Sequence, residues 1–343
     1  MTATGTVLPD YPEAGLDDAV AREVPVVHAP IDQVFRQVSR AAGTIVLALM
    51  VLIGVFLTVN SIDAISSVGV GKWVTTQEWS PETNNFGIAA VLPGSVVIAL
   101  VALTVAVPLS IGTALFITEI ATGRIRRLMT SMVDLMAAVP SLVYGIWGLA
   151  YFQPHIVPFA EFLAKYFGWI PIFDVRGADP ANPLPNPALY TSSFLIAGII
   201  VSLMVIPIQT SIMVESFSRA PQGEKEGAFA LGATKWGMIR NVVLPFGKGG
   251  MIGAVMLGLG RALGETIAVY LIIAPLFEIK FRIVENGAVT IAAMIAQRYG
   301  EANDYSMSAL MSAGLALFIL TMVVNFTASS IIARSRSGAD SEG

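Results

Sequence analysis

The sequence contains no cysteine and only two histidines, His28 and His155, among its 343 residues. Without cysteine there are no disulfides, no thiolate metal ligands and no cysteine nucleophile. The histidines lie in a polar tail and in a loop, so no paired-histidine metal motif can be drawn. Charged residues are also scarce, at 13%, whereas hydrophobic residues make up 55% of the chain. This balance excludes an ordinary soluble globular domain and indicates a polytopic membrane protein.

Long apolar runs occur six times along the chain. They fall at about residues 41–63, 91–118, 130–152, 193–216, 251–275 and 307–332. Each run is close to or above the ~20 residues that a membrane-spanning helix needs. The sequence therefore predicts an all-α polytopic fold with six transmembrane helices. The first run starts near Ala41, beyond the usual position of a signal peptide, so we expect it to remain in the protein as a helix.

The distribution of charge predicts the orientation of the chain. Basic residues gather in the N-terminal tail, the 119–130 loop, the 217–250 loop and the C-terminal tail, and the opposite loops hold few. By the positive-inside rule, both termini are expected to be cytoplasmic and the protein to be a multi-pass component of the plasma membrane. We expect four regions: a flexible acidic tail and lead-in at 1–40, a first span with an outer loop at 41–90, a core of five spans at 91–332, and a C-terminal tail at 333–343.

Two opposite charges, Arg261 and Glu265, interrupt the apolar run from Met251 to Pro275. An arginine at the centre of a membrane helix costs roughly 2.5–3.5 kcal/mol, so it is seldom left facing lipid. On one continuous helix the two side chains share a face, but such an ion pair returns only about 0.5 kcal/mol. The pair is therefore expected to line an ion or substrate path, or to form a buried ion bridge that fixes the register of neighbouring spans.

The 217–250 loop is the longest predicted cytoplasmic connection. Its pattern predicts a helix at 224–231, a break at Gly232 and a second helix at 236–243 that ends at Leu244-Pro245. Charged residues near the predicted cytoplasmic helix ends, including Glu119 with Arg124, are expected to form boundary ion pairs. So are Glu215 and Arg219.

This loop resembles the EAA loop of ABC importer permeases, in which a coupling helix fits a groove on an ATP-binding subunit. The residues that carry the resemblance are Glu226, Gly227, Ala228, Gly232, Leu244 and Pro245. The chain departs from the family pattern at Gly227, where the family has alanine, and glycine weakens a helix by up to about 1 kcal/mol. The resemblance implies a type I, MetI-like permease fold.

A second resemblance coincides with the charged pair. Residues 260–269 are similar to the signature of phosphate-specific permeases of the PstC type, and residues 139–145 are similar to the third-span segment of that family. The resemblance implies that Arg261 and Glu265 lie in the transport path. It also implies three kinds of protein partner: a second permease subunit (PstA type), two ATP-binding subunits (PstB type) and an extracytoplasmic phosphate-binding protein (PstS type). Membrane lipids are the remaining expected partner, and binding to nucleic acid is not expected.

Nothing in the sequence points to catalysis within the chain. There is no phosphate-binding Gly-Lys-Ser/Thr loop, so we expect ATP and Mg on the partner subunits, no cofactor here, and no enzyme activity of the chain itself. The alternatives are a permease for sulfate, molybdate or an amino acid, and an ion-coupled carrier that works without ATPases. The small residues Gly253, Gly258, Gly260 and Gly264 are expected to permit close packing against a neighbouring span or a partner subunit.

Overall fold

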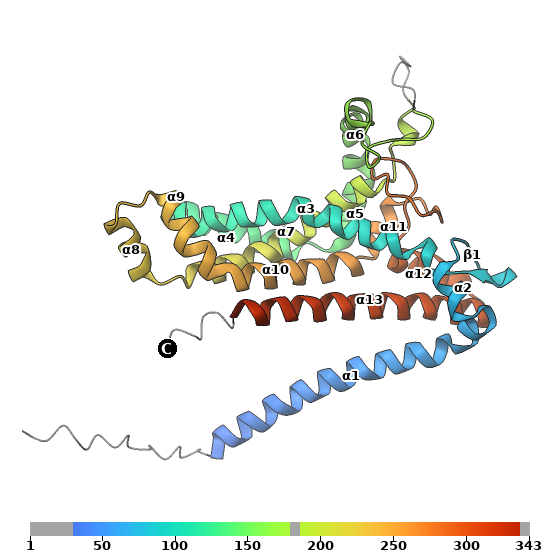
Figure 1. Cartoon of the computed structure of the whole chain (residues 1–343), viewed down its shortest axis with the longest axis horizontal. Coiled ribbons are helices and arrows are strands. Elements are labelled where there is room, and N and C mark those ends of the chain that lie inside the picture. The colour runs from blue at the N-terminus through green and yellow to red at the C-terminus, as the bar shows by residue number, and fades with distance from the viewer. Residues whose placement is uncertain (1–29, 179–185, 337–343) are drawn as a thin grey trace, which may run out of the picture. The chain divides into compact units, whose positions relative to one another are not determined.

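The computed structural model describes residues 30–178 and 186–336 (Figure 1). Of the expected tails at 1–40 and 333–343, residues 1–29 and 337–343 lie outside the described residues, as does the middle of the Pro-rich 171–187 segment. The chain divides into two units, residues 1–53 and 54–343. In the first unit the described part is the beginning of α1 (Pro30–Val68), where every side chain from Gln33 to Ile53 is exposed. A helix that is apolar on all sides suits a lipid environment.

Five helices in the described part of the chain are long and apolar enough to cross a membrane. They are Gln33–Val68, Leu92–Ile120, Phe194–Ser218, Lys235–Gly264 and Asp304–Thr327. The predicted third span is instead a pair of helical segments, Gly123–Ala138 and Ser141–Phe167, bent by 88°. The bend falls at Val139 and Pro140, both of which have extended backbone angles. The ring of Pro140 disfavours helical geometry at Val139, so this span is broken. Four predicted spans are confirmed as single helices, whereas the predicted span 251–275 is interrupted because its helix ends at Gly264.

The centre of the second unit is a bundle of α3 (Leu92–Leu115), α7 (Phe194–Ser218) and α10 (Leu244–Gly264). α13 (Asp304–Arg336) packs along α10 (Figure 1). Small residues on α10 allow close packing on α7, because a Cβ added at Gly250 would lie 2.1 Å from the hydroxyl of Ser216. The bundle core consists mainly of alanine and β-branched side chains such as Ile98, Ile200 and Val205.

One end of this bundle carries several short elements. They are α2 (Val70–Thr75), β1 (Trp79–Ser80), β2 (Asn85–Phe86), α5 (Ser141–Trp147), α6 (Gln153–Phe167), α11 (Ile267–Ile272) and α12 (Ile291–Arg298). β1 and β2 pair antiparallel, with Trp79 opposite Phe86. Both aromatic side chains are buried in a second core cluster with Met294 and Leu310. We call this end of the bundle the α6 end.

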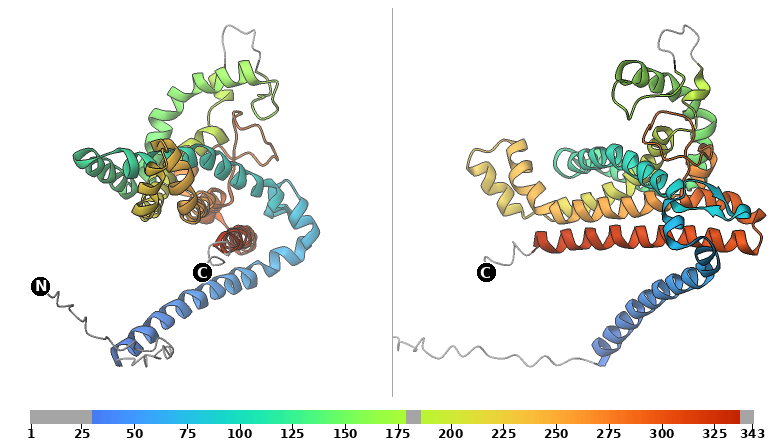
Figure 2. Two further views of the ribbon diagram at one scale, coloured as in Figure 1. Left: turned by 60° about the vertical axis from the view of Figure 1, so that its left-hand side comes forward. Right: turned by 45° about the vertical axis from the view of Figure 1, so that its right-hand side comes forward.

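The opposite end of the bundle carries α8 (Gln222–Ala230) and α9 (Lys235–Met238), which precede a π-helical turn, η7 (Ile239–Val243). A second π-helical turn, η4 (Phe116–Ile120), follows α3 and leads into α4 (Gly123–Ala138). In the right-hand view of Figure 2, α8 and α9 (gold) lie at the far end of α10 from α6 (green). We call this end the α8 end.

Candidate functional site

Arg261 lies in the last turn of α10, and its side chain is exposed. It lines a cavity of about 600 Å³ between three helices. Ile208 comes from α7, whereas Asn325 and Ser329 come from α13. The rest of the lining is apolar or glycine, so the guanidinium is the one charged group among the lining residues. An exposed, permanent positive charge on a mostly apolar surface is a candidate anion contact.

Glu265 does not continue the helix of Arg261, which corrects the predicted arrangement of the pair. α10 ends at Gly264, and Glu265 has extended backbone angles. Among the described residues, no ion pair joins Arg261 to Glu265. Glu265 is only 8% exposed, and its Oε1 accepts a hydrogen bond of 3.3 Å from the backbone N–H of Ala268. The prediction of two charges on one helical face is therefore wrong, and so is the ion-bridge interpretation.

The carboxylate of Glu265 instead stabilises the start of α11. The first backbone N–H groups of a helix lack partners within the helix, and a side-chain oxygen that accepts from one of them favours a new helix start. Gly264, immediately before it, is a weak helix former, which lowers the cost of ending α10 there. The helix break is therefore explained by Gly264 and by the carboxylate of Glu265, two local features within an apolar run.

The segments that follow the two broken helices pack together. A Cβ added at Gly145 of α5 would lie 2.9 Å from Cα of Ala268 in α11, so only glycine permits this contact. Nearby, the hydroxyl of Tyr144 donates a hydrogen bond of 3.1 Å to the carbonyl oxygen of Met136, at the end of α4. Irregular backbone within a membrane is tolerated where it is buried in protein or lines a cavity. Discontinuous helices are also typical of transport sites.

The glycines near Arg261 have two different surroundings. A Cβ added at Gly258 would lie 2.2 Å from Nε2 of Gln209, which confirms close packing at that position. At Gly253, Gly260 and Gly264 an added Cβ would meet nothing within 4 Å. The prediction of close packing against a neighbouring span of this chain is therefore wrong for these three residues. They leave an open strip on the same stretch of α10 as Arg261.

The predicted helix, break and helix in the 217–250 loop are confirmed. α8 covers Glu226, Gly227 and Ala228, and the first two are exposed. Leu231 is 91% exposed, and Gly232 has a φ of 84°, which is left-handed and favours glycine. The predicted stop at Leu244-Pro245 is wrong, because the helix continues from Lys235 to Gly264. The π-helical turn η7 ends at Val243, so Pro245 lies in the first turn of α10. There the missing N–H of proline does not remove a regular helical hydrogen bond.

A buried ion pair anchors α8 to the end of α3. Nζ of Lys225 lies 2.7 Å from Oε1 of Glu119, and the two side chains are 12% and 7% exposed. Glu119 was expected to pair with Arg124, so that prediction is wrong. The predicted pair of Glu215 and Arg219 is present at 2.5 Å. Sequence reasoning missed Lys225 because its partner is more than 100 residues away, and no local spacing signals such a contact.

A charged network fixes the loops at the α6 end. It consists of Asp174, Arg176, Glu278, Lys280, Arg282 and Glu285. Its centre is Lys280, which is 4% exposed and donates to the carbonyl oxygens of Glu285 and Asn286. Burial lowers the pKa of Lys280 below its usual 10.5, and the charge of Glu285 partly opposes this shift. The network joins the segment after α6 to the segment before α12.

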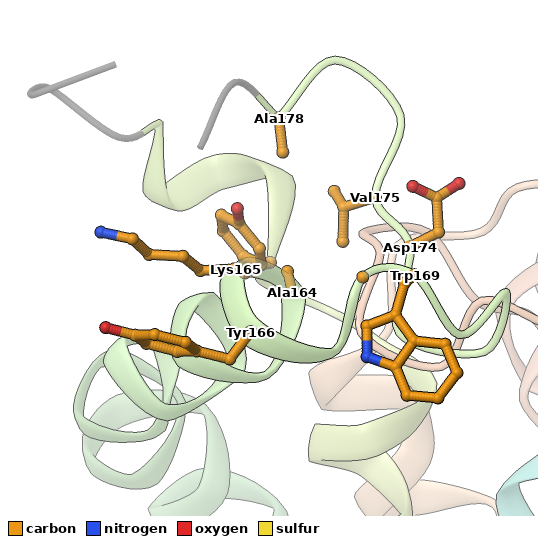
Figure 3. Close-up of a pocket in the computed structure, with 9 residues that line it drawn as sticks. Ala164, Lys165, Tyr166, Trp169, Asp174, Val175 and Ala178 are labelled. Carbon is orange, nitrogen blue, oxygen red and sulfur yellow. The ribbon is translucent and has the colours of Figure 1, made fainter. Parts of the chain in front are cut away.

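Beside this network lies a hollow of about 300 Å³ between α6 and the segment that follows it. Figure 3 shows Lys165 and Tyr166 on one side of the hollow, and Trp169 and Asp174 on the other. Trp169 is 80% exposed. Within residues 30–178 and 186–336, no group of three or more histidine, aspartate or glutamate side chains is placed to hold a metal ion.

Comparisons with known proteins agree with this architecture. The family described as "Binding-protein-dependent transport system inner membrane component" matches residues 106–337. The chain is 36% identical to phosphate transport system permease protein PstC 2 of Mycobacterium tuberculosis, covering 88% of this chain and 91% of the relative. It is 37% identical to phosphate transport system permease protein PstC of Xylella fastidiosa, covering 86% and 89%. Among solved structures, a chain of a bacterial ABC transporter that imports the acidic polysaccharide alginate matches with a TM-score of 0.55 at 16% identity, covering 88% of this chain and 99% of that chain.

Proposed function

Because this chain belongs to the binding-protein-dependent transport system inner membrane component family, and within it to the PstC-type permeases, we propose that it is a permease subunit of an ATP-driven phosphate importer. Its relatives are named as transport permeases, so the chain is a transport subunit and not itself an enzyme. The observation that carries the proposal is the exposed guanidinium of Arg261 on the cavity between α7, α10 and α13.

Arg261 supplies what a phosphate path requires. Phosphate carries between one and two negative charges near neutral pH, and a planar guanidinium holds two of its oxygens at once. Glu265 does not neutralise this charge by direct contact, because its carboxylate is engaged with the backbone of Ala268. We infer that Glu265 has two roles: it fixes the break after α10, and its negative charge near Arg261 keeps phosphate binding transient.

The partners follow from the surfaces that the chain leaves open. The open strip at Gly253, Gly260 and Gly264 suits close approach of a second permease subunit of the PstA type. The exposed residues of α8 and the turn at Gly232 suit a groove on an ATP-binding subunit of the PstB type. The α6 end, with its exposed Trp169, suits an extracytoplasmic phosphate-binding protein of the PstS type.

This assignment sets the direction of coupling. The α8 end faces the cytoplasm together with both termini, as the basic loops require. ATP and Mg bind to the partner ATPases, and no cofactor binds to this chain. Closure of the ATPases moves α8 and α9. Because the helix continues without interruption from Lys235 to Gly264, that motion reaches Arg261 through one rigid element. The path then alternates between outward and inward access.

The test is radiolabelled phosphate uptake in cells that lack this chain, complemented with the natural sequence, Arg261→Lys or Arg261→Gln. We expect Arg261→Gln to lower uptake by about tenfold or more, because one charge-assisted contact contributes about 1.5–3 kcal/mol. Arg261→Lys keeps the charge and loses the planar fork, so uptake should be intermediate. Membrane levels are measured in parallel.

Competition identifies the substrate class. Sulfate and molybdate in excess should leave uptake by the natural sequence unchanged. If Arg261→Gln restores uptake fully, Arg261 is structural and the proposed path is wrong. If sulfate or molybdate abolishes uptake, the chain transports another oxyanion.

A further inference from the structure

A second polar cavity lies at the α8 end, apart from the cavity of Arg261. Its volume is about 380 Å³, within the range of small-molecule sites. Residues from five elements line it: η4, α4, α7, α8 and α9. Its polar lining includes Glu119, Arg126, Ser218, Gln222, Lys225 and Lys235. None of these residues belongs to the proposed substrate path or to the six motif residues of the coupling loop.

The charges in this cavity do not balance. Glu119 is its single acid, and it is already paired with Lys225 at 2.7 Å. In the part of the chain that the structure describes, neither Arg126 nor Lys235 has an ion-pair partner. The buried pair therefore leaves one guanidinium and one ammonium facing the same space. Both side chains are exposed, so water screens their mutual repulsion, and an anion between them would be attracted by both charges.

We propose that this cavity binds a phosphate-type anion, supplied as inorganic phosphate or as the headgroup of an anionic phospholipid. Arg126 holds two oxygens through its planar fork, and Lys235 contacts a third as a compact point charge. The two side chains come from α4 and α9, so an anion between them joins the broken third span to the start of the long α9–α10 helix. The Glu119–Lys225 ion pair lines the remaining side of the cavity and holds α8 in place there.

The position of the cavity gives the bound anion a regulatory role. Lys225 and Phe229 of α8 line the cavity on the same helix that carries Glu226. An occupied cavity stiffens the attachment of α8 to α4, and an empty one leaves it looser. Imported phosphate accumulates on the side to which this end is assigned. That regulatory reading rests on the proposed function, whereas anion binding by Arg126 and Lys235 does not.

The experiment measures how fast phenylglyoxal modifies Arg126 in the assembled transporter, held in phosphatidylcholine nanodiscs and analysed by peptide mass spectrometry. Inorganic phosphate at about ten times its Kd should slow the modification about tenfold, because only the unoccupied site reacts. Arg124 is the matched control, since it is exposed on the same helix and does not line the cavity. Its modification rate should not change. Lys235→Gln should weaken the protection of Arg126 while leaving Arg124 unaffected.

Nanodiscs that contain phosphatidic acid, without added phosphate, separate the two sources. Protection of Arg126 there identifies the lipid headgroup, and protection by inorganic phosphate in phosphatidylcholine identifies the free ion; either result supports the site. Equal slowing of Arg124 and Arg126, or protection that persists unchanged in Lys235→Gln, overturns it. So does an Arg126 that is unreactive without any added anion, because the ATPase subunit then covers the cavity. Phosphate uptake by Lys235→Gln is recorded separately, so that loss of the anion site is distinguished from failure of transport.

Discussion

The two helix breaks at Gly232 and Glu265 differ in what holds them. The break at Gly232 is exposed, and an added Cβ there would meet nothing within 4 Å. Its shape depends on a φ of 84° and on one distant anchor, the ion pair of Lys225 with Glu119. The break at Glu265 is buried, and it is held by the hydrogen bond to Ala268 and by the packing of α11 on α5.

The contrast distinguishes an exposed surface that can bind a partner from a buried site whose geometry is fixed within the chain. The α8 segment presents Leu231 and Trp236 to the outside, at 91% and 62% exposure, and so suits a partner. The Glu265 break is held by contacts within the chain. Arg261 lies directly before it and needs such a rigid surrounding, because a loosely held site loses its geometry. Three changes test this contrast, and a fourth tests the charged network at the α6 end; they run from the largest expected effect to the smallest.

Lys225→Gln should have the largest effect. It leaves the carboxylate of Glu119 buried without its partner, and removal of one member of a buried pair costs about 3–5 kcal/mol. We expect a lower thermal unfolding midpoint of the purified transporter and reduced amounts in the membrane. The double variant Lys225→Gln with Glu119→Gln should recover most of the loss. If the single variant is as stable as the natural chain, the ion pair does not anchor α8.

Gly232→Asp should uncouple the transporter without unfolding it. A left-handed residue with a side chain costs roughly 1–2 kcal/mol, so the exposed turn changes shape. We expect phosphate uptake to fall by about tenfold, the factor that 1.4 kcal/mol corresponds to, while ATP hydrolysis continues. Gly227→Ala is the matched control, because an added Cβ there meets open space and restores the alanine of the family pattern. Its uptake should stay normal; equal losses in both variants would contradict a special role for the turn.

Glu265→Ala and Glu265→Gln separate the structural role of this side chain from its charge. Alanine removes the acceptor for the Ala268 N–H, and loss of such a cap costs about 1 kcal/mol. Glutamine keeps an acceptor oxygen and removes the charge. We therefore expect only the alanine variant to lower the unfolding midpoint. If glutamine leaves the rate of uptake and its phosphate dependence unchanged, the charge of Glu265 has no part in transport.

The pH dependence of stability at the α6 end should show the smallest effect. Burial lowers the pKa of Lys280 below 10.5, so between the lowered pKa and 10.5 the unfolded chain keeps a proton that the folded chain releases. The free energy of unfolding should therefore rise with pH across this window. Lys280→Met should remove the slope in thermal unfolding measured at increasing pH. A slope that survives in this variant assigns the effect to another group.

Much of the fold follows from the sequence because burial in a membrane demands long apolar runs. Four of the six predicted spans match single helices, and the helix at 224–231 and its break at Gly232 follow from local propensity. The end of α10 at Gly264 was not predicted. A short polar signal lies there within an apolar run, and hydropathy averaged over the run hides it. The continuation of the helix through Pro245 depends on a π-helical turn, which has no simple sequence signature.

The sequence by itself determined that this is a multi-span membrane protein, that Arg261 is a costly charge in an apolar segment, and that the 217–250 loop forms a helix, a turn and a helix. These features depend on composition and on neighbours within a few residues. Only the tertiary structure decided that Glu265 contacts Ala268 rather than Arg261, that Lys225 pairs with Glu119, and that Arg126 and Lys235 share a cavity. Those contacts join residues on different helices, and their geometry is set by how the helices pack.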